Sequence, residues 1–206
     1  PARLADMSGR NTRFMNDPFL FKRDGAAELF LIRHGDAIPG PDEIIPGGLY
    51  DNLPLSKTGR QQAQALAERL KDGHFDAMYS SPLRRCQETA APLVKYLGLA
   101  PVLVEEIKEI RLGELRPMPV PERGASLEEL TNALQARQID IVAIAASNGN
   151  WDGIPNSEPS GAFRQRVVEA INGIASRHHG QRVLIFAHGG VGIEFFQCLV
   201  NLITLV

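Results

Sequence analysis

Three short segments of the sequence carry side chains that could handle a phosphoryl group. They are Arg33-His34-Gly35, His188-Gly189-Gly190 and the run SSPLRR at residues 80–85. A neutral imidazole can attack phosphorus or hydrogen-bond to a phosphate oxygen, and a guanidinium binds such oxygens in pairs. Glycines beside the histidines let the backbone approach an anion and permit the φ and ψ angles of tight turns. If the fold brings these segments together, they form a phosphate site.

Residue type alone leaves other interpretations open. His188 could be a core histidine, Arg84 or Arg85 could lie on a solvated helix face, and Glu109 in EEIKEIRLGEL reads most simply as a surface carboxylate. A metal hydrolase is a further alternative, because imidazoles and carboxylates suit several divalent ions; its ligands would be His34, Asp36, Glu109 and His188. No tight spacing such as His-x-x-x-His supports this alternative, so we expect no metal.

Strands that alternate with helices must position the three segments. Short apolar runs at 28–33, 75–79, 102–104 and 183–186 predict strands. Apolar residues at helical spacing predict helices after Ser56, after Ser126, over 167–175 and over 191–199. Pro82 is expected in the first turn of a further helix, which Pro92 should kink or restart. This alternation predicts a three-layer α/β/α fold with a mostly parallel central sheet.

The carboxyl ends of parallel strands are where ligands bind in such folds, and each of the three segments follows a predicted strand. The stretch 114–160 is expected to be a partly helical insertion over this edge. Residues 1–27 are expected to be a partly ordered lead-in, and 28–206 a single domain. The ending CLVNLITLV stops inside apolar sequence, which favours an incomplete C-terminus.

The overall composition indicates which kinds of partner and which cellular compartment to expect. A net charge of -2 and a pI near 6.3 provide no dense basic face, so we expect no nucleic-acid partner. No run reaches the roughly 18 apolar residues of a membrane helix, so we expect no membrane partner. The two cysteines, Cys86 and Cys198, make no disulfide framework and predict a cytoplasmic location. A homodimer is compatible with the sequence.

Five motifs, in order, resemble those of the histidine phosphatase (phosphoglycerate-mutase-like) superfamily. They are FLIRHG at 30–35, LSKTGRQQA at 55–63, SSPLRRCQETA at 80–90, EIRLGEL at 109–115 and FAHGG at 186–190. The resemblance implies that His34 is the nucleophile that becomes phosphorylated and that Glu109 protonates the leaving oxygen. It further implies that the phosphate is held by Arg33, Arg85 (with Arg84 as second choice), His188 and Gly189. No cofactor is implied.

The resemblance favours a phosphatase that hydrolyses a phosphomonoester of a small metabolite. The loop after Gly35 lacks the Trp-Asn pair of the cofactor-dependent phosphoglycerate mutases and has Gly40 where that asparagine would fall. Mutase activity is therefore the second interpretation. A phosphohistidine protein phosphatase and a non-catalytic relative that binds phosphorylated ligands are the remaining ones.

Overall fold

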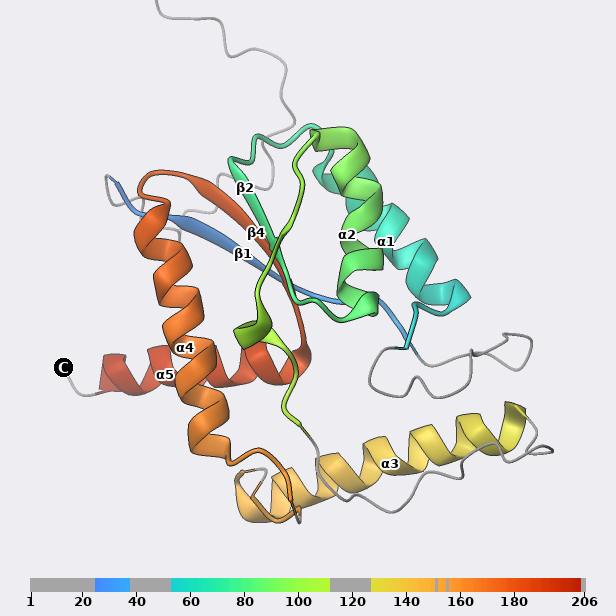
Figure 1. Ribbon diagram of the computed structural model, residues 1–206. Helices are drawn as coiled ribbons and strands as arrows, with labels where there is room; N and C mark the ends of the chain where they lie inside the picture. Colours follow the sequence, from blue (N-terminus) through green and yellow to red (C-terminus); the bar gives the residue numbers. More distant parts are fainter. Residues whose placement is uncertain (1–24, 38–52, 112–126, 151, 155, 205–206) are drawn as a thin grey trace, which may run out of the picture.

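The computed structural model describes residues 25–37, 53–111, 127–150, 152–154 and 156–204 (Figure 1). Its strands form one sheet in the order β1-β4-β2-β3, and every pairing between them is parallel. The bounds are Glu28–Arg33 for β1, Ala77–Ser80 for β2, Val102–Leu103 for β3 and Arg182–Ala187 for β4. The predicted parallel α/β sheet is confirmed.

The helices form layers on both faces of this sheet. Figure 1 shows α1 and α2 on one side and α4 on the other, with α5 crossing behind the lower half of α4. The bounds are Lys57–Leu70 for α1, Arg84–Leu97 for α2, Glu105–Ile107 for the short 3-10 helix η3, Leu127–Asn148 for α3, Ser160–Arg177 for α4 and Gly189–Thr204 for α5. Helix α3 belongs to the predicted insertion and lies beyond the carboxyl ends of the strands (Figure 1).

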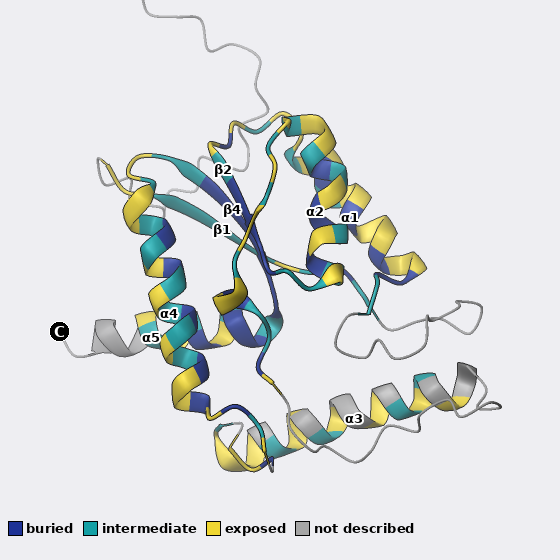
Figure 2. Cartoon of the chain, viewed as in Figure 1, coloured by how far each residue is buried: buried dark blue, intermediate teal, exposed yellow. Residues whose placement is uncertain are grey.

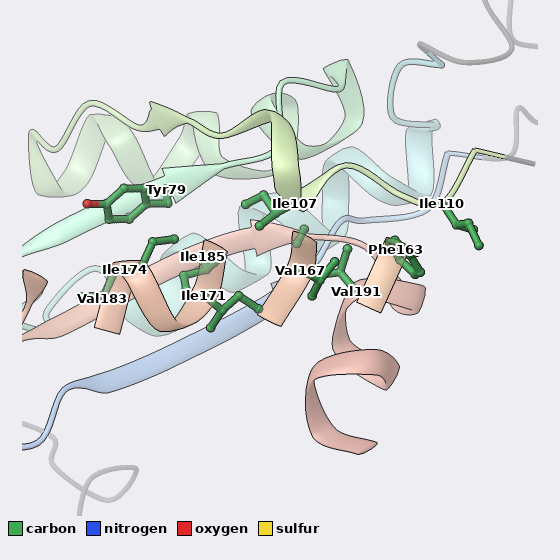
Figure 3. Packing of buried hydrophobic residues seen from close by; sticks show 11 residues of the cluster. Tyr79, Ile107, Ile110, Phe163, Val167, Ile171, Ile174, Val183, Ile185 and Val191 are labelled. Atoms are coloured by element: carbon green, nitrogen blue, oxygen red, sulfur yellow. The ribbon is translucent and has the colours of Figure 1, made fainter. Parts of the chain in front are cut away.

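The central strand β4 supplies both halves of the core, because successive side chains of a strand point to opposite faces. Val183, Ile185 and Ala187 pack with α4 and α5 (Figure 3). Leu184 and Phe186 pack with α1 and α2 on the other face. Figure 2 shows the result, with burial concentrated along β4 and on the inner faces of the helices. The strand ends are therefore held in a tightly packed frame.

Helix α2 differs from the sequence prediction at Pro82, and of the kink or restart predicted at Pro92 the restart is absent. Its N-cap is Leu83, so Pro82 precedes the helix instead of occupying its first turn. Pro92 does not restart the helix, which continues to Leu97. A proline there removes one backbone hydrogen bond, but Leu93 beside it is fully buried, and this packing maintains one continuous helix.

The N-terminus of α1 is tied to the loop that follows β1. The Ser56 hydroxyl caps the helix by accepting from the amide of Gly59 at 3.0 Å, and the Ser56 amide donates to the carbonyl of Asp36 at 2.9 Å. A Cβ atom on Gly59 would lie 2.0 Å from the Asp36 carbonyl oxygen. Glycine is therefore required for this close approach, which fixes the backbone next to His34.

Several predictions concern residues outside the described ranges. They include the lead-in up to residue 24, most of the loop at 36–54 and the insertion at 114–126. The division into a lead-in and one domain stays a prediction. None of the helices in the described part of the chain is long and apolar enough to cross a membrane.

Candidate active site

The ends of β1, β2 and β4 bring the three segments to one edge of the sheet. The amide of His34 donates to the carbonyl of Ala187 at 3.0 Å, and the amide of Ser81 donates to that of Phe186 at 2.8 Å. His188 follows directly on β4. The ring centroids of His34 and His188 consequently lie 5.2 Å apart, although the two residues are distant in the sequence.

His34 has the protonation state that a nucleophile requires. Its Nδ1 atom lies 2.7 Å from the carbonyl oxygen of Gly35. A carbonyl can only accept, so Nδ1 carries the hydrogen and Nε2 keeps its lone pair. Burial, with the charges of Arg85 and Arg33, lowers the pKa of His34 to about 4. The ring is therefore neutral at pH 7, with Nε2 available to attack phosphorus.

His188 is a buried, neutral histidine held by polar groups on two sides. The Arg85 guanidinium donates from Nη2 to Nδ1 at 3.2 Å, which leaves the hydrogen on Nε2, 2.9 Å from the Ser81 hydroxyl oxygen. The Cys86 sulfur lies 3.5 Å from Nε2. Burial first, and then the charge of Arg85, lower the pKa of His188 to about 2. The ring can thus donate a hydrogen bond but carries no charge.

Two arginines supply the positive charge of the site. Arg85 contacts His188, and its charge acts on the pKa of both histidines. Arg33 runs beside Gly189, where a Cβ atom would lie 3.7 Å from the arginine Nε. Arg84 points elsewhere and pairs with Glu88 at 2.6 Å on the outer surface of α2. The structure thus brings Arg33, Gly189 and Arg85 to the histidines, and not Arg84.

Glu109 reaches the site from the segment after η3. Its carboxylate oxygens accept from the amides of Gly190 at 3.2 Å and Ile110 at 3.1 Å. Burial raises the pKa of Glu109, against the opposing effects of these two amides and of the charges on Arg85 and Arg166. A carboxyl group in this position can hold a proton at a pH where an exposed glutamate is ionised. Glu109 is half-buried, so it is not a freely exposed surface carboxylate.

One of the two purposes predicted for the glycines beside the histidines, the φ and ψ angles of tight turns, is wrong. None of Gly35, Gly189 and Gly190 has a positive φ angle, so these turns do not depend on glycine's torsional freedom. Gly35 and Gly190 are instead required because a side chain would not fit there. A Cβ atom on Gly190 would lie 2.3 Å from Oε1 of Glu109, and one on Gly35 would lie 2.8 Å from the carbonyl oxygen of Gly59.

Two supporting residues were missed by the sequence reasoning. Ser81 contacts His188, and Thr89 accepts from the amide of Gly35 at 3.0 Å while donating to the Arg85 carbonyl at 2.6 Å. Thr89 therefore connects the loop that carries His34 and Gly35 to the helix that carries Arg85. Its position beside Ala90 on the buried face of α2 was the available signal, because a buried hydroxyl must find a hydrogen-bond partner.

A cavity lies next to the site, and no cluster of possible metal ligands is found in the described part of the chain. A cavity of about 820 Å³ is lined by Arg33, His188, Gly189 and side chains of α5, but not by His34. Within the described ranges, no group of three or more His, Cys, Asp or Glu side chains is placed to hold a metal ion. The absence of a metal requirement stays a prediction.

This geometry, two neutral histidines and two guanidiniums at the carboxyl edge of a parallel sheet, defines a phosphoryl-transfer site. Branch 1 of the histidine phosphatase superfamily matches residues 29–201, and the chain belongs to this superfamily. The predicted resemblance is confirmed.

The chain is also similar to individual proteins, both in sequence and in structure. The chain is 30% identical to phosphoglycerate mutase-like protein 4 of Arabidopsis thaliana, over 80% of this chain and 67% of the relative. It is 31% identical to the metal-independent phosphoserine phosphatase of Arabidopsis thaliana, over 80% of this chain and 65% of the relative. It thus spans about two thirds of these relatives. The solved structure of Bacillus stearothermophilus YhfR superposes with a TM-score of 0.61 at 28% identity, covering 85% of this chain and 81% of that one.

Proposed function

We propose that the protein is a phosphatase that hydrolyses a small phosphomonoester through a phosphohistidine on His34. The observation that carries this proposal is the pairing of a neutral His34, whose Nε2 is unprotonated, with a half-buried Glu109 whose pKa is raised. The first residue is poised to attack and the second to donate a proton. Two such groups in one site divide a difficult displacement into two easier steps.

In the first step, Nε2 of His34 forms a bond to phosphorus as the bond from phosphorus to the ester oxygen breaks. Arg33 and Arg85 stabilise the charge on the remaining phosphate oxygens. His188 exchanges its Nε2 hydrogen bond to the Ser81 hydroxyl for one to a phosphate oxygen. Glu109 gives its proton to the departing oxygen, which leaves as an alcohol. Nδ1 of His34 retains its hydrogen bond to Gly35, which disperses the positive charge of the phosphorylated ring.

In the second step, water attacks phosphorus and the bond to Nε2 breaks. Glu109 now accepts the proton that the water gives up, which restores its acidic form. Inorganic phosphate leaves and His34 returns to its neutral state. The residues return to their starting forms, so no co-reactant other than water is needed.

The substrate is proposed to be a small phosphorylated metabolite, and phosphoserine is the first compound to test. This choice is supported by the similarity to a relative named as a phosphoserine phosphatase. A cytoplasmic location is proposed on the basis of the two cysteines, both of which carry free thiols.

The test is turnover of p-nitrophenyl phosphate and phosphoserine by the purified protein, with His34→Ala as the inactive variant. Rapid quenching with labelled substrate should trap phosphate as an acid-labile, alkali-stable adduct on His34. His74→Ala is a matched control, because His74 is an exposed histidine at the opposite end of the sheet. Label on serine or cysteine, or activity that survives in His34→Ala, would refute the proposed nucleophile.

A further inference from the structure

Arg166 and Glu158 form an ion pair beside the site. The Nε and Nη2 atoms of Arg166 donate to the two carboxylate oxygens of Glu158 at 2.6 and 2.8 Å. The Glu158 side chain is 9% exposed and that of Arg166 22%, and the guanidinium also lies over the Phe163 ring at 4.7 Å. Buried pairs of this kind contribute little net stability compared with apolar residues. The function of this pair should therefore follow from the other hydrogen bonds that Arg166 and Glu158 make.

The remaining hydrogen bonds of the pair go to the backbone that carries Glu109. Arg166 donates to the carbonyls of Glu106, of Lys108 at 2.8 Å and of Glu109 at 3.3 Å. Glu158 accepts from the amide of Arg111 at 3.2 Å, and its own amide donates to the Arg111 carbonyl at 2.8 Å. The pair thus holds the chain on both sides of Glu109.

The backbone at residues 108–111 has no regular secondary structure to hold it. Helix η3 ends at Ile107, and no strand follows it up to residue 111. Its peptide groups must find partners elsewhere, because unpaired buried peptide groups are costly. The guanidinium of Arg166 in α4 and the carboxylate of Glu158, two residues before that helix, supply these partners. The position of Glu109 is consequently set from α4.

We propose that Arg166 and Glu158 are positioning residues that align the Glu109 carboxyl with the leaving oxygen of the substrate. This inference rests on the proposed function. Proton transfer requires donor and acceptor within hydrogen-bond reach, roughly 2.6–3.2 Å between heavy atoms. A displacement of about 1 Å can cost on the order of 10²-fold in rate. The effect of losing the pair should therefore fall on the step in which Glu109 acts.

The pairing also limits how far the Arg166 charge affects the acid. That charge acts to lower the pKa of Glu109, whereas burial raises it and is the largest influence. The carboxylate of Glu158, whose pKa is itself lowered by its hydrogen bonds from Arg166, offsets the positive charge next to it. A neutral pair can hold the backbone with several directed donors without strongly favouring the ionised form of Glu109.

The experiment compares an alkyl and an aryl phosphate. Phosphoserine needs a proton on its leaving oxygen, whereas p-nitrophenolate leaves readily without one. Arg166→Lys, Arg166→Gln and Glu158→Gln should lower kcat on phosphoserine by about 10²-fold and change kcat on p-nitrophenyl phosphate little. Arg164→Gln is the matched control, because Arg164 lies on the same helix but pairs with Glu194 of α5 at 2.6 Å. It should leave both rates unchanged.

A second arm tests whether the pair acts through Glu109. In the Glu109→Gln background, Arg166→Gln should reduce phosphoserine turnover little further, because the acid is already absent. Equal losses on both substrates, loss of the fold included, or fully additive effects would show a general structural role and overturn the inference. A wild-type protein inactive on every phosphomonoester would instead refute the proposed function.

Discussion

The amide of Gly190 lies 3.2 Å from Oε2 of Glu109, so the helix that begins after β4 also holds the proposed general acid. Gly190 therefore belongs to the proposed proton-transfer machinery, whereas its neighbour Gly189 lies beside Arg33. The two glycines after His188 thus lie next to Arg33, which is proposed to bind the phosphate, and Glu109, which is proposed to protonate the leaving group.

Gly190→Ala should displace the Glu109 carboxyl, because the added Cβ would lie 2.3 Å from its Oε1 atom. We expect turnover of phosphoserine to fall by about 10²-fold and that of p-nitrophenyl phosphate to fall much less. Gly192→Ala is the control, since its Cβ would meet a Leu31 methyl at an ordinary 3.7 Å. Similar activities for the two variants would contradict the assigned role of Gly190.

Glu109→Gln tests the general acid directly. The amide preserves the shape of the side chain but has no acidic proton, so hydrolysis of alkyl phosphates should fall by about 10²- to 10⁴-fold. Aryl phosphates should be affected much less, because their leaving groups need no proton. The measurement is kcat for both substrate types. Equal losses on both would point to a structural or phosphate-binding role, and Glu106 would then be tested.

The free energy of unfolding should depend on pH through His34, which is half-buried, and His188, which is buried. Their pKa values are lowered from 6.5 to about 4 for His34 and about 2 for His188. Between pH 6.5 and 4, these two imidazoles bind protons in the unfolded chain but stay neutral in the folded chain. The free energy of unfolding should therefore fall as the pH drops through this range, by up to about 1.4 kcal/mol per pH unit for each histidine.

Urea unfolding at several pH values checks this dependence. His188→Gln should show a shallower loss between pH 6.5 and 4 than the wild type, because one of the two proton-binding differences is gone. His179→Gln replaces an exposed histidine and should retain the wild-type slope. The same slope in all three proteins would count against the burial of His188 as a neutral ring.

Removal of divalent metal should leave the activity intact. The positive charge at the proposed phosphate position comes from Arg33 and Arg85, whose guanidiniums need no ion to bind phosphate oxygens. The measurement is phosphatase activity before and after EDTA treatment and dialysis. Loss of activity with recovery on one specific divalent ion would overturn the assignment of His34 as nucleophile.

Phosphatase and mutase activities differ in how long the phosphohistidine survives. A mutase must protect it from water until a second acceptor is presented, whereas a phosphatase admits water. We expect release of inorganic phosphate without priming by 2,3-bisphosphoglycerate, and only slow interconversion of 2- and 3-phosphoglycerate. Rapid interconversion after priming, with little free phosphate, would instead favour the mutase interpretation.

Local sequence patterns were sufficient to predict the sheet and the residues that meet at its edge. The run at 28–33 forms β1 with the predicted bounds, and β4 differs from its prediction by one residue at each end. His34 and His188 each follow such a strand. Because the carboxyl ends of parallel strands share one edge, the order of strands and motifs alone indicated that the histidines would meet.

The choice between Arg84 and Arg85 was decided by tertiary packing. Adjacent residues on a helix point about 100° apart, so one faces the site and the other faces solvent. Which one does so depends on the rotation of α2 about its axis. The burial of Cys86, Ala90 and Leu93 against the sheet and α1 sets that rotation, and no feature of the arginine pair itself encodes it.

The protonation states and the support of Glu109 were likewise determined by the fold. The pKa values of His34 and Glu109 are shifted chiefly by burial, which depends on the layers packed around them. Arg166 lies far from Glu109 in the sequence and reaches it through the backbone of a segment with no regular structure. The sequence by itself thus determined which reactive groups this protein has, whereas their charge and alignment came from contacts between residues that no local pattern connects.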